Sequence, residues 1–289
     1  ELGLLKMDFL GLRTLTVIRD AEAAIQKKDP SFSIRKLDYD DAATYKMLGQ
    51  GETEGVFQLE SSGMKQVLVG LQPQNLEDVI ALISLYRPGP MDSIPTYLRN
   101  RHEPDKISYK TPQLAHILDV TNGCIVYQEQ VMQIFRELAG FSFGQADNVR
   151  RAMSKKKHAV MEAEREHFVH GCTEPGHECP GCVANGISEK VANEIYDEMS
   201  SFASYAFNKS HAACYAYVAF QTAYLKCHYP SEFMAALLTS VLDNTDKVIE
   251  YSGECARLGI KVLPPDVNIS NGGFTADNGK IRFGLNAVK

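Results

Sequence analysis

Side chains suited to phosphate and metal chemistry are concentrated in a few separated stretches of this sequence. The first is Gly3–Leu12, an apolar run in which only Lys6 and Asp8 are charged. In an extended backbone both would lie on one face. A carboxylate at the end of a strand suits a metal ligand or a catalytic acid, whereas an exposed Lys–Asp pair would stabilise the surface only slightly. This stretch alone favours the surface pair, so the catalytic interpretation depends on residues further along the chain.

A dense basic run forms the second stretch. Asn148 to Met161 contains five Lys and Arg residues and no Asp or Glu, although the whole chain has a formal net charge of −6. On a helix, Arg151 and Lys155 share a face. Unmixed positive charge attracts phosphates, whereas an ordinary solvated face mixes both signs. We therefore predict phosphate binding by the following residues: Arg150, Arg151, Lys155, Lys156 and Lys157.

The third stretch, Tyr205–His211, is predicted to be a turn that becomes the start of a helix. The free N–H groups of a helix N-terminus favour anions. Lys209 and His211 would add donors, and the two aromatic rings of this stretch could stack on a base. Ser210 could also serve as a simple helix cap, which is compatible with anion binding.

Arg87 is followed by Pro88-Gly89-Pro90, a rigid turn. The turn could hold the guanidinium toward a phosphate. Arg87 could instead interact with the C-terminal end of the helix that precedes it. The sequence leaves both interpretations open.

A cysteine-rich loop lies between His170 and Cys182. The turn Cys179-Pro180-Gly181-Cys182 presents two thiolates to one point, and Cys172 with His177 or His170 could complete a tetrahedral zinc site. A polar surface loop with spare thiols explains the same residues equally well. The seven cysteines of the chain are unevenly spaced, which suits a reducing cytoplasm better than a disulfide framework.

Apolar residues recur at helical spacing along most of the chain, so we predict a mainly α-helical fold. The expected helices are 12–26, 41–49, 61–73, 75–87, 128–138, a segment after Gly144 that includes the basic run, 159–169, 188–199, 210–226, 231–242 and 245–258. The last four are expected to start at Ser or Thr caps. Extended pieces are expected at 55–60, 123–127 and 260–263, a polar loop up to Pro112, and a β-hairpin around Asn278-Gly279.

Composition places the chain among ordinary globular proteins. It has 289 residues, of which 44% are hydrophobic and 23% charged, enough for one large domain or two smaller ones. No apolar run approaches the roughly 20 residues of a membrane span. The first residues lack the features of a signal peptide. Because the chain begins inside an expected strand, we expect it to be a piece of a longer protein.

Taken together, these stretches resemble the C family of bacterial replicative DNA polymerases. The matching motifs run in family order along nearly the whole chain, which makes the joint match far more specific than any one motif. They are Leu5-Lys6-Met7-Asp8-Phe9-Leu10-Gly11-Leu12-Arg13-Thr14, Val56-Phe57-Gln58-Leu59-Glu60-Ser61, Arg87-Pro88-Gly89-Pro90, Tyr127-Gln128-Glu129-Gln130-Val131-Met132, Arg150-Arg151-Ala152-Met153-Ser154-Lys155-Lys156-Lys157, Phe207-Asn208-Lys209-Ser210-His211 and Leu263-Pro264-Pro265-Asp266.

The resemblance implies residues 1–14 as the end of the palm with the catalytic strand, 15–260 as a helical fingers domain, and 261–289 as a small β segment. It implies Asp8 as the third of three aspartates that bind two Mg²⁺ ions, with Lys6 beside the site. The other two aspartates belong to an upstream motif absent from this sequence. Arg150, Arg151 and His211 fall where the fingers meet the triphosphate of the incoming nucleotide, with Lys209 nearby. The cysteine loop departs from the family pattern, so zinc is not implied by the resemblance.

The implied function is transfer of a nucleotide from a dNTP to a primer 3′-OH. Two metal ions and basic side chains would stabilise the charge that develops on the phosphates. The implied partners are primer–template DNA, dNTP, a sliding clamp and other replisome subunits, in the bacterial cytoplasm. Arg87 and the three lysines of the basic run are expected as weaker DNA or phosphate contacts. One aspartate cannot hold two Mg²⁺ ions, so this chain alone should be inactive. The alternatives are a non-catalytic nucleotide- or nucleic-acid-binding module, with or without a stabilising zinc ion, and a helical protein-interaction domain.

Overall fold

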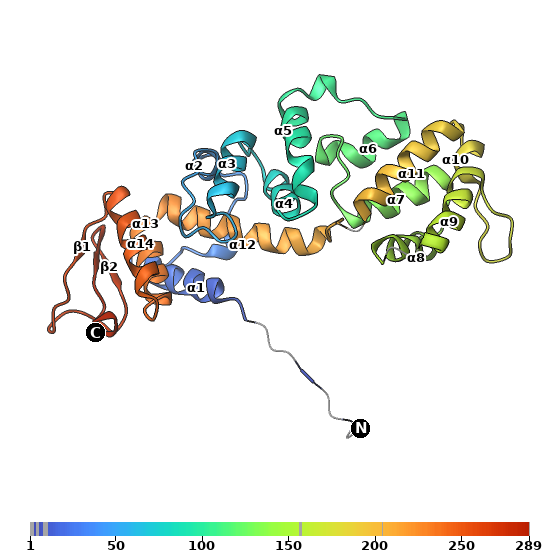
Figure 1. The fold of residues 1–289 in the computed structure, drawn as a ribbon. Helices are drawn as coiled ribbons and strands as arrows, with labels where there is room; N and C mark the ends of the chain where they lie inside the picture. Colours follow the sequence, from blue (N-terminus) through green and yellow to red (C-terminus); the bar gives the residue numbers. More distant parts are fainter. Residues whose placement is uncertain (1–2, 4–5, 8–10, 156–157, 204, 289) are drawn as a thin grey trace. The chain divides into compact units, whose positions relative to one another are not determined.

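The computed structural model describes residues 3, 6–7, 11–155, 158–203 and 205–288 (Figure 1). Within these ranges the chain forms fourteen α-helices and one small sheet, so the predicted mainly α-helical class is confirmed. The chain divides into two compact units. Unit 1 comprises Glu1–Leu76 and Tyr217–Lys289, and unit 2 comprises Glu77–Ala216. The predicted strand through Asp8 lies outside the described residues, and its described neighbours Lys6 and Met7 are exposed.

Unit 1 is built around the packing of its first helix against a late one. Its helices are α1 (Arg13–Gln26), α2 (Ala42–Gly49), α3 (Ser62–Leu71), most of α12 (Lys209–His228), α13 (Pro230–Ser240) and α14 (Thr245–Arg257). Ala21 of α1 and Ala235 of α13 are buried, and such small side chains let the two helices approach closely. Larger residues such as Phe233 and Leu238 fill the surrounding core.

Two helices in unit 1 start at a side-chain cap. Asp41 accepts a hydrogen bond from the Thr44 N–H at 2.8 Å, and Ser61 accepts one from the Met64 N–H at 3.3 Å. Each satisfies a backbone donor that the first helical turn leaves free.

The small sheet lies at the end of unit 1. Its strands are β1 (Val262–Leu263), β2 (Thr275–Asp277) and β3 (Lys280–Arg282), in the order β1-β3-β2. β2 and β3 are antiparallel and β1 is parallel to β3. Asn278 and Gly279 connect β2 to β3 with φ of 48° and 75°, the positive values that a tight hairpin turn requires. The predicted hairpin is therefore confirmed.

Unit 2 contains the central helices of the sequence. They are α4 (Leu76–Leu85), α5 (Ile94–His102), α6 (Ala115–Leu118), α7 (Gln128–Ala139), α8 (Phe143–Ser154), α9 (His158–His170), α10 (Gly181–Ala184), α11 (Glu189–Ala203) and the first residues of α12. Phe135 of α7 packs edge-to-face on Phe168 of α9 and Tyr196 of α11, with ring centroids 5.1 and 6.0 Å away. These aromatic contacts hold α7, α9 and α11 together.

Short 3₁₀ helices complete the fold. They are η1 (Ile34–Lys36), η2 (Pro90–Ser93), η3 (Pro104–Lys106), η4 (Pro112–Leu114), η5 (Asp119–Thr121) and η6 (Leu285–Ala287). In the described part of the chain, no helix has both the length and the hydropathy needed to cross a membrane.

Three predictions about loops and extended segments were wrong. The expected polar loop before Pro112 contains η2 and α5, because its prolines occupy first-turn positions that suit a helix start. The expected strand 123–127 reduces to one bridge, between Tyr127 and Phe207. The expected extended piece 55–60 is a series of turns, in which Gly55 and Gln58 have φ of 74° and 64°.

Candidate functional site

The bridge between Tyr127 and Phe207 brings two of the predicted motifs together in unit 2. The Phe207 N–H donates to the carbonyl of Val126 at 3.2 Å, and the Gln128 N–H donates to the carbonyl of Phe207 at 2.9 Å. The side chain of Gln128 adds a hydrogen bond to the carbonyl of Ala206 at 3.0 Å. The start of α7 is thereby joined to the segment that leads into α12.

The sequence Gln128-Glu129-Gln130 explains why this joint forms. Gln130 is buried, and its Oε1 accepts hydrogen bonds of 2.9 Å from the N–H groups of Val126 and Tyr127. This fixes the extended backbone that enters α7. Gln128 contacts the segment before α12, as described above, and Glu129 contacts the first turn of α12. Each of the three polar side chains therefore supports a different part of the site.

The N-terminus of α12 is capped from within the protein. The carboxylate of Glu129 accepts the Lys209 N–H at 3.1 and 3.2 Å and the Asn208 Nδ2 at 2.9 Å. Asn208 Oδ1 accepts the His211 N–H at 2.8 Å. The cap is therefore Asn208, and the suggestion that Ser210 caps this helix was wrong. The expectation of free N–H groups also needs correction, because Glu129 and Asn208 take two of them.

The two predicted arginines of α8 differ in their surroundings. Asp147 pairs with Arg150 at 2.7 Å and with Arg151 at 2.7 Å. Arg150 also donates to Gln128 Oε1 at 3.0 Å, and its side chain is only 16% exposed. The side chain of Arg151 is 66% exposed. Arg150 thus links α8 to α7, whereas Arg151 is accessible to a ligand.

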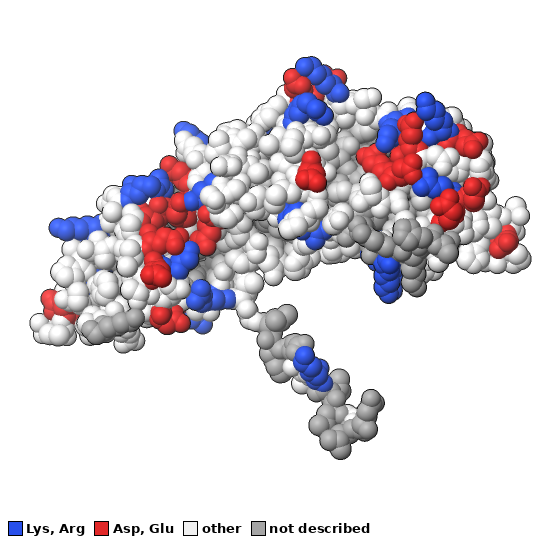
Figure 2. All heavy atoms as spheres, in the orientation of Figure 1, with Lys and Arg blue, Asp and Glu red and all other residues white. Residues whose placement is uncertain are grey.

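The basic run has an acidic neighbour in the structure. Asp147 precedes it directly, and its hydrogen bonds with Arg150, then the charges of both arginines, lower the pKa of its carboxyl group. The carboxylate therefore stays ionised beside them. Lys155 is exposed, whereas Lys156 and Lys157 lie outside the described residues. Figure 2 shows a similar mixture of acidic and basic side chains elsewhere on the visible face.

Arg87 contacts the stretch Tyr205–His211 that leads into α12. Its guanidinium is 4.5 Å from the centroid of the Phe207 ring, and it donates to the carbonyl of Tyr205. Burial lowers the pKa of Arg87. Gly89 approaches the Tyr205 ring so closely that a Cβ there would lie 2.3 Å from it. These contacts favour a role for the Arg-Pro-Gly-Pro turn in holding the segment before α12.

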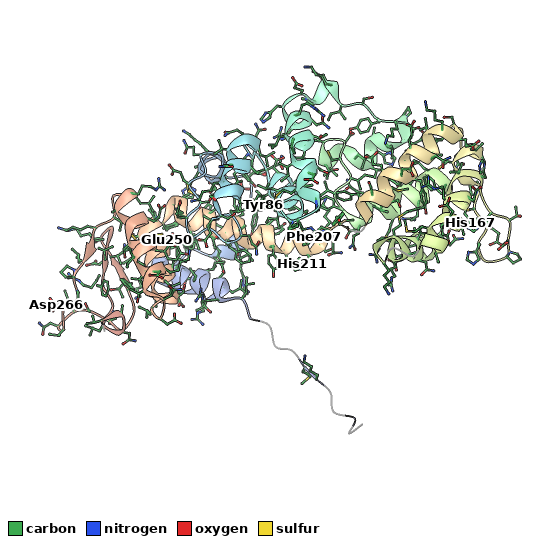
Figure 3. All side chains as sticks on the ribbon, viewed as in Figure 1. Tyr86, His167, Phe207, His211, Glu250 and Asp266 are labelled. Carbon is green, nitrogen blue, oxygen red and sulfur yellow. The ribbon has the colours of Figure 1, made fainter. Side chains whose placement is uncertain are left out.

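The side chains of Lys209 and His211 have different neighbours. Lys209 Nζ lies 3.0 Å from a carboxylate oxygen of Glu77 and 5.2 Å from the centroid of the buried Tyr127 ring. His211 is exposed, and its ring lies 5.5 Å from that of Phe207 and 4.4 Å from that of Tyr215. Figure 3 labels Phe207 and His211 at the start of α12. His211 is therefore the more accessible of the two predicted donors.

A cleft of about 510 Å³ opens beside these residues in unit 2. Its lining comes from α7, α8 and the start of α12. It consists of Gln128, Glu129, Met132, Gln133, Arg136, Glu137, Phe143, Asp147, Arg150 and Asn208. Acidic and basic side chains both line it, so the cleft is not a simple anion site.

The predicted zinc ligands lie in different surroundings. Cys172 and Cys179 face each other across an isolated bridge with two backbone hydrogen bonds of 2.9 Å. Cys182 is buried in the core of unit 2, where burial raises the pKa of its thiol to about 12. His177 is exposed. Among the residues that the structure describes, no group of three or more His, Cys, Asp or Glu side chains could hold a metal ion. These residues therefore do not fit a zinc site.

Comparison with known proteins identifies the family to which this chain belongs. The model of the bacterial DNA polymerase III alpha subunit finger domain matches residues 14–176. A helix-hairpin-helix motif matches residues 259–289, although the described part of that segment contains β1–β3 and η6 and no α-helix. The chain belongs to the bacterial DNA polymerase III alpha subunit family.

Relatives from distant bacteria match the chain over its whole length. DNA polymerase III subunit alpha of Thermus aquaticus is 50% identical over 294 residues, which are 23% of that protein. The subunit alpha proteins of Bacillus subtilis (strain 168) and Borreliella burgdorferi are 47% and 45% identical and are covered to 25% and 24%. The chain thus spans about a quarter of the length of these relatives.

Sequence reasoning missed the acidic and amide residues that organise the site. Glu77, Glu129 and Asp147 each pair with a predicted basic residue or its backbone. The signal for Asp147 was present, since Asp three or four residues before Arg pairs on a helix. Glu129 and Glu77 are far from Lys209 in the sequence, so only the fold reveals their contacts.

Proposed function

We propose that this chain supplies the fingers of a replicative DNA polymerase and that unit 2 binds the triphosphate of the incoming dNTP. The observation that carries the proposal is the meeting of Arg87, Arg150, Lys209 and His211 around the Tyr127–Phe207 bridge. These residues come from three separate segments, and a hydrogen bond or ring contacts connect each segment to that bridge. Membership of the polymerase family supports the same assignment.

The basic residues would make different contacts with the triphosphate. Arg151 and His211 are accessible, so we assign them to direct contact with the triphosphate. Arg150 lies between Asp147 and Gln128, which suits an orienting contact with limited freedom. Lys209 would reach a phosphate only on leaving Glu77. Cationic donors next to the phosphates stabilise the negative charge that develops on them during transfer.

Asp8 is assigned as one of the magnesium ligands, with Lys6 beside it. A carboxylate oxygen is the donor that Mg²⁺ prefers. Two Mg²⁺ ions, when bound, would activate the primer 3′-OH and stabilise the leaving pyrophosphate. Because this sequence contains only one of the three aspartates that the family resemblance implies, we expect the isolated chain not to extend a primer.

Contacts with DNA are assigned more broadly. Lys155, Lys156 and Lys157 would neutralise phosphates of the primer–template, and the segment that matches the helix-hairpin-helix motif would add a second DNA contact. The sliding clamp and other replisome subunits would bind elsewhere in the longer protein. We expect that protein to act in the bacterial cytoplasm.

Primer extension by the full-length enzyme tests the triphosphate assignment. Arg151→Ala and His211→Ala should each raise the KM for dNTP about tenfold, while the affinity for primer–template stays within about twofold, since a lost charged hydrogen bond costs about 1.5–3 kcal/mol. Lys190→Ala, an exposed cation of α11, is the matched control and should change neither value. An unchanged KM in both site variants would contradict the assignment.

Asp8→Asn in the full-length enzyme tests the catalytic assignment. We expect primer extension to fall by at least about 10³-fold, because an amide is a poor Mg²⁺ ligand. Activity near that of the wild type would exclude Asp8 as a ligand. It would favour the alternative, a module that binds nucleotide or nucleic acid without taking part in the chemistry.

A further inference from the structure

Glu129 occupies an unusual place in the proposed nucleotide site. It is the only acid in the first turn of α7, yet its hydrogen bonds go to another helix, α12. Both of its oxygens accept the Lys209 N–H, and one also accepts Asn208 Nδ2. Hydrogen bonds to an ionised carboxylate are stronger than neutral ones. A negative charge at this end of α12 is also favoured by the helix dipole.

Asn208 extends this constraint to His211. Its side-chain amide is held at both ends, because Nδ2 donates to Glu129 and Oδ1 accepts the His211 N–H at 2.8 Å. Two successive hydrogen bonds therefore connect the Glu129 carboxylate to the backbone of His211. The side chain of His211 then leaves the helix from a fixed position, and its ring contacts those of Phe207 and Tyr215.

The same carboxylate affects where a phosphate can bind. An anion at a helix N-terminus needs the free N–H groups of the first turn. Here the Lys209 N–H is bonded to Glu129 and the His211 N–H to Asn208. A triphosphate at that position would also meet the like charge of Glu129. Among the side-chain donors predicted for the triphosphate, His211 and Arg151 are the most exposed.

We propose that Glu129 is a positioning residue for the incoming nucleotide. It fixes the first turn of α12 and keeps the triphosphate away from the backbone of that turn, so that the phosphates contact His211 and Arg151. This inference rests on the proposed function of unit 2. It adds that an acidic residue, which repels phosphate, is required for tight dNTP binding.

The experiment compares Glu129→Gln and Glu129→Ala in the full-length enzyme with Glu137→Gln. Glu137 lies on the same helix and lines the same cleft, but it pairs with His116 and Gln133. The measurements are KM and kcat for one dNTP opposite its complementary base, the Kd for primer–template, and the melting temperature. Glu129→Gln keeps the size of the side chain, so it decides the question even if the alanine variant does not fold.

We expect Glu129→Gln to raise the KM for dNTP about tenfold, with kcat and the Kd for DNA within about twofold and the melting temperature unchanged, because positioning of the triphosphate affects binding of dNTP first. Glu137→Gln should leave all four values unchanged. An unchanged KM in Glu129→Gln would overturn the proposal. A parallel loss of kcat, DNA affinity and melting temperature would also overturn it, since that pattern indicates a general structural role.

The Arg151→Ala variant separates this proposal from the one on which it rests. If Arg151→Ala raises the KM and Glu129→Gln does not, the nucleotide site stands and the role of Glu129 is wrong. If neither Arg151→Ala nor His211→Ala changes the KM, the nucleotide site itself is wrong, and the role of Glu129 falls with it.

Discussion

Gly89 determines how closely two segments of unit 2 approach each other. Its φ of +100° and ψ of −74° suit only glycine, and the Tyr205 ring occupies the space where a Cβ would be. Tyr205 in turn accepts a hydrogen bond from Arg87 through its carbonyl, and the Arg87 guanidinium lies over Phe207. The absence of one side chain therefore allows a turn to contact the segment that carries the candidate site.

Gly89→Ala should loosen this contact. Displacing an aromatic ring from a packed position costs about 2 kcal/mol, which corresponds to roughly 30-fold faster local opening. Hydrogen exchange of the Phe207 and Gln128 amides in the full-length enzyme would measure it, because both amides form the bridge. Gly144→Ala is the control, since a Cβ there has no atom within 4 Å. Equal exchange in the two variants would show that Gly89 is not needed for the contact.

Neighbouring residues of one sequence motif can have separate roles. Arg150 and Arg151 share the Asp147 carboxylate, but only Arg151 is largely exposed. Helix geometry explains the difference, because consecutive residues point about 100° apart and only one of them can face α7. A basic pair in a sequence therefore need not offer two equivalent ligand contacts.

At the scale of elements, the predictable features were those with local causes. The helical spacing of apolar residues gave α1, α7 and α14 nearly to the residue, and Asn278-Gly279 gave the hairpin. The strand at 123–127 was wrong because its partner, Phe207, lies about eighty positions away and pairs at one residue only. α5 was missed because it buries only Ile94 and Tyr97, too few for a clear period.

The functional roles of the basic residues in the candidate site stay predictions, and their surroundings became visible only in the structure. Arg150, Arg151, Lys209 and His211 were identified by charge and by family resemblance. Two of their acidic partners, Glu77 and Glu129, depend on contacts between distant segments, which no periodic pattern encodes. The described cysteines do not fit the predicted zinc site for a similar reason. Their spacing in the sequence did not reveal that Cys182 is in the core.

The cap of α2 offers a test at the level of one helix. Asp41 caps α2 through Thr44 and also pairs with His228 at 2.9 Å. Asn caps as well as Asp, so Asp41→Asn should cost little, whereas Asp41→Ala should destabilise α2 by about 1 kcal/mol. Hydrogen exchange of the α2 amides would compare the variants. If Asp41→Asn opens α2 as readily as the alanine variant, the pair with His228 rather than the cap holds this helix.

A buried ion pair connects parts of unit 1 that are distant in the sequence. Lys226 Nζ of α12 lies 2.7 Å from Glu254 of α14 and donates to the carbonyl of Glu54 at 2.8 Å. The two charged side chains are 0% and 4% exposed. Arg257 adds two hydrogen bonds of 2.7 Å to the same carboxylate. Three segments far apart in the sequence thus meet at the Lys226 ammonium group.

The pair also has a defined pH dependence. Burial opposes the ionisation of Glu254, but hydrogen bonds from Arg257 and Lys226 outweigh it and lower its pKa. The ionised carboxylate therefore contributes stability above its unfolded pKa of about 4.3, and the contribution is lost as the pH falls through the folded value. Burial lowers the pKa of Lys226, so its charge costs stability at neutral pH.

Glu254→Gln should therefore destabilise unit 1 more than Lys226→Met does. The glutamine variant leaves a buried cation without its counter-charge, which costs about 3–5 kcal/mol, whereas Glu254 keeps Arg257 in the methionine variant. Hydrogen exchange of the α14 amides in the full-length enzyme would show the order. The difference in stability between wild type and Glu254→Gln should also shrink as the pH falls below the unfolded pKa of about 4.3. A larger effect of Lys226→Met would contradict this account.

The internal carboxylate at the start of α12 has a consequence for inhibitor chemistry. Glu129 and Asn208 both line the 510 Å³ cleft of unit 2, so a small molecule in that cleft can reach them. A phosphate mimic would be repelled there, because Glu129 already carries the anion that α12 accepts. A compound with an ammonium or amide donor aimed at Glu129 would compete for its hydrogen bonds and release the first turn of α12. Selectivity for this cleft would then come from donor groups, and such compounds need not resemble a nucleotide.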